Sequence, residues 1–185
     1  MKTLTIFIVL LISTTISAQE YNVDKKQSKL NWTGKAAFNA YKLNGKLSLE
    51  KGVLIIEDNQ IKQLTVLIDM KSLDHSIGDL KKHLRSKDFF EVKKYPTATF
   101  TLTKPIEIIE GNVTLTGTMK IKKTTREETI IARISKENNA YTITFDTKLD
   151  RTKYGVKFNS PSFFKKMKEN AIADKFSLKG EFLFQ

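Results

Sequence analysis

The chain has 185 residues, of which 40% are hydrophobic and 28% are charged, a balance that allows one globular core and excludes collagen-like or wholly disordered structure. It contains no cysteine, which excludes disulfide frameworks, thiolate metal sites and cysteine nucleophiles. The 32 Lys and Arg residues outnumber the 20 Asp and Glu residues, and the resulting formal charge of +12 fits either an anionic partner or a lysine-rich solvated surface.

The N-terminal segment has the composition of a secretory signal peptide. A basic Lys2 precedes an almost wholly apolar run over residues 4–12, and small and polar residues lead to Ala18. We expect residues 1–18 to be removed and residues 19–185 to form one periplasmic or secreted domain. The apolar run is about half of the ~20 residues that a membrane-spanning helix needs. Export also makes nucleic acid an unexpected partner.

The rest of the chain alternates between apolar and polar residues, which is the pattern of half-buried β-strands. The apolar members of the expected strands are, in chain order, Leu30 and Trp32; Leu47 and Leu49; Leu64, Val66, Ile68 and Met70; Ala98, Phe100 and Leu102; Val113, Leu115, Gly117, Met119 and Ile121; Tyr141, Ile143, Phe145 and Leu149; and Phe176, Leu178, Gly180, Phe182 and Phe184. Turn chemistry at residues 58–59, 111–112 and 138–139 predicts short hairpin connections. The pattern predicts an all-β antiparallel meander of about eight or nine strands, which either stacks as two sheets or closes into a barrel.

Two long segments break the alternation. Residues 76–95 and 160–174 have helix-like spacing, which predicts short helices in two long loops. Long loops on a β scaffold often carry function. In the second loop, Phe163 and Phe164 precede two lysines. This combination fits a lid helix over the mouth of a barrel, or a short amphipathic element in contact with an anionic membrane.

The sequence has no motif for metal binding or catalysis. His75 and His83 are the two histidines of the chain, and their spacing matches no common zinc motif. A nucleophile elbow, a phosphate-binding loop and a dinucleotide fingerprint are also missing from the sequence. We therefore expect no catalytic residue, no metal and no cofactor.

Three neighbouring segments carry a family resemblance. Residues 68–73 read Ile-Asp-Met-Lys-Ser-Leu, residues 83–92 read His-Leu-Arg-Ser-Lys-Asp-Phe-Phe-Glu-Val, and residues 95–100 read Tyr-Pro-Thr-Ala-Thr-Phe. Together they resemble the signature block of the YceI-like family. Further matches follow in family order at Asp24 with residues 28–32, at residues 117–121 and at residues 150–156. The resemblance implies a lipocalin-like antiparallel β-barrel of about eight strands, exported to the periplasm, that holds a polyisoprenoid or another long-chain amphiphilic lipid.

The candidate lipid contacts are aromatic residues of the strands and long loops, together with one histidine. They are Trp32, Phe38, His83, Phe89, Phe90, Phe100, Tyr154, Phe163 and Phe164. Buried aromatic residues also serve packing, so Trp32, Phe89 and Phe90 fit a solid core as well as a cavity wall. His83 fits an orienting hydrogen-bond partner.

A basic cluster in the first long loop is the candidate headgroup site. Lys81, Lys82 and Arg85 would bind a phosphate group. At Leu80-Lys81 the chain departs from an Arg-Asp pair of many relatives, so a headgroup role of that pair is not transferred. Asp150 and Arg151 adjoin an expected turn, where a salt bridge or hydrogen bonds would pin the loop.

Whether the interior of the expected barrel is filled or hollow decides between the functions that the sequence allows. An eight-stranded barrel either just fills with side chains or holds one ligand, and the small inward residues Ala98, Gly117 and Gly180 leave room for a channel. We expect a binding protein that sequesters or transports an isoprenoid or fatty-acyl lipid, as a monomer or homodimer, with transient contact to a membrane surface as an option. An enzyme acting on such a lipid and a filled-barrel envelope interaction module are the alternatives.

Overall fold

The computed structural model describes residues 18–185 apart from residues 39, 110 and 165–169. Its strands are β1 (Gln19–Asn22), β2 (Lys29–Lys35), β3 (Lys42–Glu57), β4 (Gln60–Asp69), β5 (Thr97–Leu102), β6 (Ile106–Glu107), β7 (Gly111–Ile121), β8 (Thr124–Glu137), β9 (Ala140–Asp150) and β10 (Lys175–Phe184). Its helices are α1 (Gly78–Arg85) and the short 3-10 helices η1 (Met70–Ser72) and η2 (Arg151–Tyr154). The expected signal peptide lies outside the described residues except for Ala18. Within the described residues, no helix has the length and apolar character to span a bilayer.

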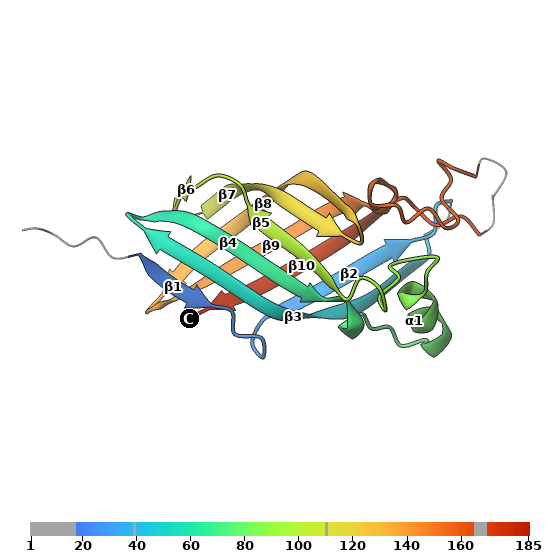
Figure 1. The fold of residues 1–185 in the computed structure, drawn as a ribbon, viewed down its shortest axis with the longest axis horizontal. Coiled ribbons are helices and arrows are strands. Elements are labelled where there is room, and N and C mark those ends of the chain that lie inside the picture. The colour runs from blue at the N-terminus through green and yellow to red at the C-terminus, as the bar shows by residue number, and fades with distance from the viewer. Residues whose placement is uncertain (1–17, 39, 110, 165–169) are drawn as a thin grey trace, which may run out of the picture.

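Eight of the described strands close into an antiparallel barrel (Figure 1). The hydrogen-bonded order is β3-β2-β10-β9-β8-β7-β5-β4, and β4 pairs with β3 to complete the ring. The short strands β1 and β6 continue the lines of β2 and β5: β1 pairs with the second half of β3, and β6 pairs with the start of β4. The prediction of an all-β, lipocalin-like antiparallel barrel is confirmed.

The end of the barrel at the left of Figure 1, which we call the filled end, holds the C-terminus and two of the predicted hairpin turns, at residues 58–59 and 138–139. Asp58, Asn59 and Asn138 have the positive φ angles that tight hairpins require. Asn22 and Gln185 exchange two backbone hydrogen bonds, each with an N···O distance of 3.0 Å. The first strand and the last residue are therefore joined at this end.

The predicted turn at Gly111-Asn112 is wrong, because both residues belong to β7. They pair with Ile134 and Arg133 of β8. The connection into β7 instead passes through Pro105, which has no N–H to donate to a strand ladder and so interrupts the pairing after β5. A turn that the sequence analysis did not identify joins β7 to β8, where Lys122 has a φ of 54°.

The opposite end, which we call the cavity end, carries the two long loops, residues 70–96 and 151–174 (Figure 1). The helix expected in the first loop is present as α1. In the second loop, the described residues 160–164 and 170–174 form turns, bends and an isolated bridge rather than a helix. The middle of that expected helix lies outside the described residues.

Aromatic rings fill the middle of the barrel where the sequence predicts room for a channel. A side chain at Gly117 would place its Cβ 2.6 Å from Cζ of Phe100, and one at Gly180 would overlap the ring of Phe145. These two glycines therefore accommodate rings rather than leave open space. Of the three small inward residues, Ala98 is the one that faces an open interior, at the cavity end.

Gly45 is required for close contact between β3 and the first long loop. It lies opposite Trp32 in the β2–β3 pair, and a Cβ at this position would overlap the Asp74 carbonyl oxygen and lie 2.6 Å from Trp32 Nε1. That carbonyl accepts a hydrogen bond from Trp32 Nε1 at 3.2 Å. The glycine therefore lets Trp32 anchor the loop to the barrel.

We predict that Gly45→Ala lowers the free energy of unfolding by about 1–3 kcal/mol, because the added methyl group is overpacked and displaces the loop. Gly78→Ala is the matched control, since a Cβ there meets nothing within 4 Å. Denaturant unfolding measures both variants. Equal stability of the two would show that the contact at Gly45 is not required.

Candidate functional site

The barrel is hollow at its cavity end. A cavity of about 310 Å³ lies between the strands and the two long loops, within the range of about 300–1,000 Å³ that is typical of small-molecule sites. Its strand wall consists of Trp32, Gly34, Leu43, Leu47, Ile68, Ala98, Met119, Ile121, Phe176 and Leu178. Its cap consists of Met70, Leu73, Leu80, His83, Leu84, Phe89 and Phe90 from the first loop, and of Arg151 with residues 170–173 from the second.

The polar groups of this cavity lie mainly at its rim. Lys35, Tyr41 and Asn170 contribute to the lining and are exposed to solvent, so they mark where the cavity opens. Farther from the rim, the charged or titratable groups among the described lining residues are His83 and Arg151. The arrangement is an apolar chamber with a polar entrance, which suits a ligand with a hydrocarbon body and a polar end.

An aromatic cluster forms one side of the cap. The His83 ring packs edge-to-face against Phe89 at 5.1 Å and against Phe158 at 4.7 Å. Phe90 contacts Phe176 of β10 in the same manner at 6.4 Å. Edge-to-face packing fixes the orientation of these rings, so the first loop presents a rigid aromatic surface to the cavity.

The basic residues of α1 hold the first loop in place. Arg85 Nε donates a hydrogen bond to the Leu73 carbonyl at 2.8 Å, and Lys81 forms an ion pair with Asp74 at 2.8 Å. The hydrogen bond from Lys81 lowers the pKa of the Asp74 carboxyl below its ordinary value. Lys82 pairs with Asp79 on the exposed face of the helix. None of these three basic residues lines the cavity.

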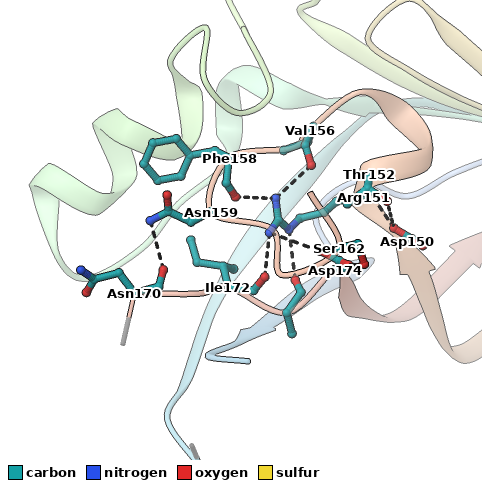
Figure 2. Close-up of polar contacts among 11 residues, drawn as sticks. Asp150, Arg151, Thr152, Val156, Phe158, Asn159, Ser162, Asn170, Ile172 and Asp174 are labelled. Atoms are coloured by element: carbon teal, nitrogen blue, oxygen red, sulfur yellow. Dashed lines mark hydrogen bonds and ion pairs between the residues drawn. The ribbon is translucent and has the colours of Figure 1, made fainter. Parts of the chain in front are cut away.

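A buried arginine holds the second loop in place (Figure 2). Arg151 Nε donates a hydrogen bond to the Ala173 carbonyl at 3.0 Å, and Nη2 donates one to the Ile172 carbonyl at 2.8 Å. Nη1 donates to the carbonyls of Val156 and Phe158, both at 2.9 Å. The guanidinium thus joins the first part of the loop, at residues 156 and 158, and its last part, at residues 172 and 173, to the start of η2. Hydrogen bonds that pin this loop were one of the two roles expected for Asp150 and Arg151 from the sequence.

The charge of Arg151 is balanced by nearby carboxylates. Burial lowers the pKa of this guanidinium, and the charges of Asp174 and Asp150 oppose the shift. Asp174 Oδ1 lies 3.8 Å from Nη2, and the Arg151 guanidinium is also 5.9 Å from the ring of Phe89. An arginine side chain stays protonated in proteins, so Arg151 brings a permanent charge to the wall, but its donors are directed at the loop backbone.

The second loop is also joined to the end of β2. The Ala173 amide donates to the Lys35 carbonyl at 2.9 Å, and the Ala37 amide donates to the Ala171 carbonyl at 2.8 Å. These bonds place residues 171–173 over the barrel as part of the cavity wall.

The structure brings together some of the residues that the sequence analysis selected as lipid contacts. Trp32, His83, Phe89 and Phe90 line the cavity. Phe100 lines a second, smaller space of about 40 Å³ deeper in the barrel.

The remaining selected residues do not line either space. Tyr154 is buried beside the barrel wall, where its hydroxyl donates to Glu128 Oε1 at 2.6 Å, and burial raises its pKa. Phe38, Phe163 and Phe164 lie in loops with 66%, 49% and 49% of their surface exposed. Lys157 lies 4.3 Å above the ring of Phe163.

Several wall residues were not selected from the sequence. Strand alternation already predicted that Ile68, Ala98 and Met119 point inward, but it did not show which of the inward residues face open space. Lys35 at the rim had no distinguishing signal among the many lysines of the chain.

The two histidines do not form a metal site. His75 Nδ1 accepts a hydrogen bond from the Ile77 amide at 2.9 Å, whereas His83 belongs to the aromatic cluster. Among the residues that the structure describes, no three His, Cys, Asp or Glu side chains are grouped as metal ligands.

The closed antiparallel barrel with a hollow end defines a lipocalin-like fold. The family model of the YceI-like domain matches residues 21–184, so the chain belongs to the YceI-like family. A UPF0312 protein of Vibrio vulnificus is 29% identical over 119 residues, and this match spans 63% of each chain.

Two solved structures share the fold at low sequence identity. BcnA of Burkholderia cenocepacia is 18% identical with a TM-score of 0.65, and the match covers 87% of this chain and 98% of BcnA. A polyisoprenoid binding domain from Saccharophagus degradans, implicated in plant cell wall breakdown, is 14% identical with a TM-score of 0.68, and the match covers 89% of this chain and 97% of that domain.

We predict that Arg151→Lys lowers the free energy of unfolding by about 3 kcal/mol, because lysine keeps the charge but leaves buried carbonyl groups without donors. The variant should also accelerate hydrogen exchange at the amides of Ile172 and Ala173 more than at the amide of Ile143, which is buried inside the barrel. Arg133→Lys on the exposed face of β8 is the control. A loss below about 1 kcal/mol would contradict the role of the guanidinium as the clamp of this loop.

Proposed function

We propose that this protein binds an isoprenoid or fatty-acyl amphiphile and sequesters or carries it without changing it chemically. The hydrocarbon chain would lie in the cavity and the headgroup at the rim. The hollow, apolar cavity end is the observation that supports this function. A chamber lined by side chains such as Leu47, Ile68 and Phe176 offers water few hydrogen bonds, so transfer of a hydrocarbon chain into it is favourable. The description of the Saccharophagus degradans domain as polyisoprenoid binding supports an isoprenoid as one ligand class.

The expected affinity follows from the burial of the chain. Each buried methylene group contributes about 0.8 kcal/mol, so about ten buried carbons contribute about 8 kcal/mol. The loss of chain and overall motion on binding reduces this gain. Because about 8 kcal/mol corresponds to a Kd of about 1 μM, we expect micromolar or weaker binding unless the headgroup adds favourable contacts.

We also propose a periplasmic or secreted location and transient contact with a membrane surface. The signal-like sequence of residues 1–18 supports a periplasmic or secreted protein. The exposed rings of Phe163 and Phe164 beside Lys157 fit transient contact with a membrane surface. Either a monomer or a homodimer is compatible with this function.

We predict that Ala98→Leu weakens the binding of farnesol at least about tenfold, because the larger side chain displaces several ligand carbons that each contribute about fourfold in affinity. Ala98 is buried and faces the cavity. The free energy of unfolding should stay unchanged or rise, since the new side chain fills empty space. Calorimetry and melting curves measure the two effects.

Thr99→Val is the matched control for this variant, because the alternation of β5 places residue 99 on the outer face. It should leave binding unchanged. Equal farnesol affinity in Ala98→Leu and the original protein would contradict a ligand in this cavity. Recovery of chemically altered farnesol, detected by mass spectrometry, would contradict the proposal of a carrier in favour of an enzyme.

We also predict that Lys35→Gln lowers the affinity for farnesyl phosphate about fivefold and leaves farnesol unaffected, since an exposed charge pair about 4 Å apart contributes about 1 kcal/mol in water. The difference should shrink with added salt. Lys82→Gln on the exposed face of α1 is the control. A larger loss for Lys82→Gln than for Lys35→Gln would place the headgroup at α1, as the sequence analysis expected, and not at the rim.

A further inference from the structure

The cavity has a floor that separates it from a second apolar space. The second space, of about 40 Å³, lies deeper in the barrel, and its lining includes Phe100, Leu115 and Phe145. The two spaces share three lining residues, which are Ile68, Met119 and Leu178. These three side chains are therefore the floor of the cavity and the roof of the smaller space.

Met119 is the adaptable member of this floor. Its side chain is 3% exposed and unbranched, whereas the Ile68 side chain is β-branched and stiff at χ1. Methionine has three rotatable bonds and fills irregular gaps in apolar interiors. Removal of the Met119 side chain beyond Cβ would connect the cavity with the smaller space below it.

Beyond the smaller space the barrel is packed. The rings of Phe100 and Phe145 lie against Gly117 and Gly180, and the filled end is closed by Tyr21 against Tyr141, with ring centroids 5.0 Å apart. A hydrocarbon chain that enters from the rim therefore meets a first stop at the floor and a second stop at these rings. Any part of the chain that exceeds the available depth stays at the rim in contact with water.

The cavity volume sets the length of chain that fits above the floor. An apolar cavity of about 150 Å³ accepts benzene, which has six carbons. The cavity of about 310 Å³ is about twice as large, so it accommodates about twelve carbons on the same scale.

We propose that this cavity measures chain length: it holds a hydrocarbon chain of about twelve carbons, and Met119 sets the limit. This inference rests on the proposed function and narrows it to medium-length chains. A fatty acid of about twelve carbons or an isoprenoid of two or three units fills the space, whereas a long polyprenyl chain exceeds it.

The test uses linear fatty acids with about eight to eighteen carbons and calorimetry on the full protein. The affinity of the original protein should rise about fourfold with each added methylene and should level off near twelve carbons. In Met119→Ala the rise should continue for about four more carbons, because the chain then occupies both the place of the removed Met119 atoms beyond Cβ and the smaller space of about 40 Å³.

Leu115→Ala is the matched control. Leu115 lies on the same strand and the same inward face as Met119, is similarly buried, and lines the smaller space without belonging to the floor. It should enlarge the smaller space and leave the limit near twelve carbons. Ile68→Ala changes a second floor residue, on β4, and should also raise the chain-length limit. This variant provides the test if Met119→Ala does not fold.

Two results would overturn the proposal. One is a rise in affinity of the original protein that continues through sixteen or more carbons, and the other is an equal shift of the limit in Met119→Ala and Leu115→Ala. Failure to bind any fatty acid, together with failure to bind farnesol, would instead overturn the proposed function itself.

Discussion

The width of a closed eight-stranded barrel is the constraint on which the rest of this structure depends. At that width, inward side chains of ordinary size just fill the interior, so the size of each inward residue decides whether its layer is solid. At the filled end, the large residues Tyr21, Tyr141 and Phe184 lie on neighbouring strands and are buried in the interior. At the cavity end, β5 contributes Ala98. The cavity therefore results from residue size at particular layers rather than from a wider barrel.

The cavity also needs a cover that does not collapse into it. The two long loops provide this cover, and each is held by an arginine that donates to backbone carbonyls: Arg85 to Leu73 in the first loop, and Arg151 to several residues of the second. A buried cation is costly to desolvate unless hydrogen bonds compensate it. Because Arg151 directs its donors at the loop, it can line an apolar chamber without making that chamber a general anion site.

The fold followed from the sequence because side-chain alternation is a local property. The inward sets of β4, β5 and β7 were visible directly, for example at Ile68, Ala98 and Met119. Closure of the barrel was not visible, because the pairing of β10 with β2, which joins the last strand to the first, and the packing of two sheets satisfy the same alternation. The family resemblance, and not the pattern, selected the barrel.

The candidate site was only partly predictable for a different reason. Alternation does not apply in loops, so it could not distinguish Phe89 and Phe90, which face the cavity, from Phe38 and Phe163, which face solvent. Composition likewise placed the headgroup cations at the densest basic cluster, on α1. There Lys81 and Arg85 are engaged within their own loop, and the exposed Lys35 at the rim lies in a strand of unremarkable sequence.

The joining of Asn22 with Gln185 has a practical consequence for handling the molecule. Both residues lie at the end of the barrel remote from α1 and the long loops (Figure 1). A dye, affinity tag or solid support attached through Gln185 would project away from the entrance. The protein could thus be immobilised through Gln185 with its apolar cavity still facing the bulk solution.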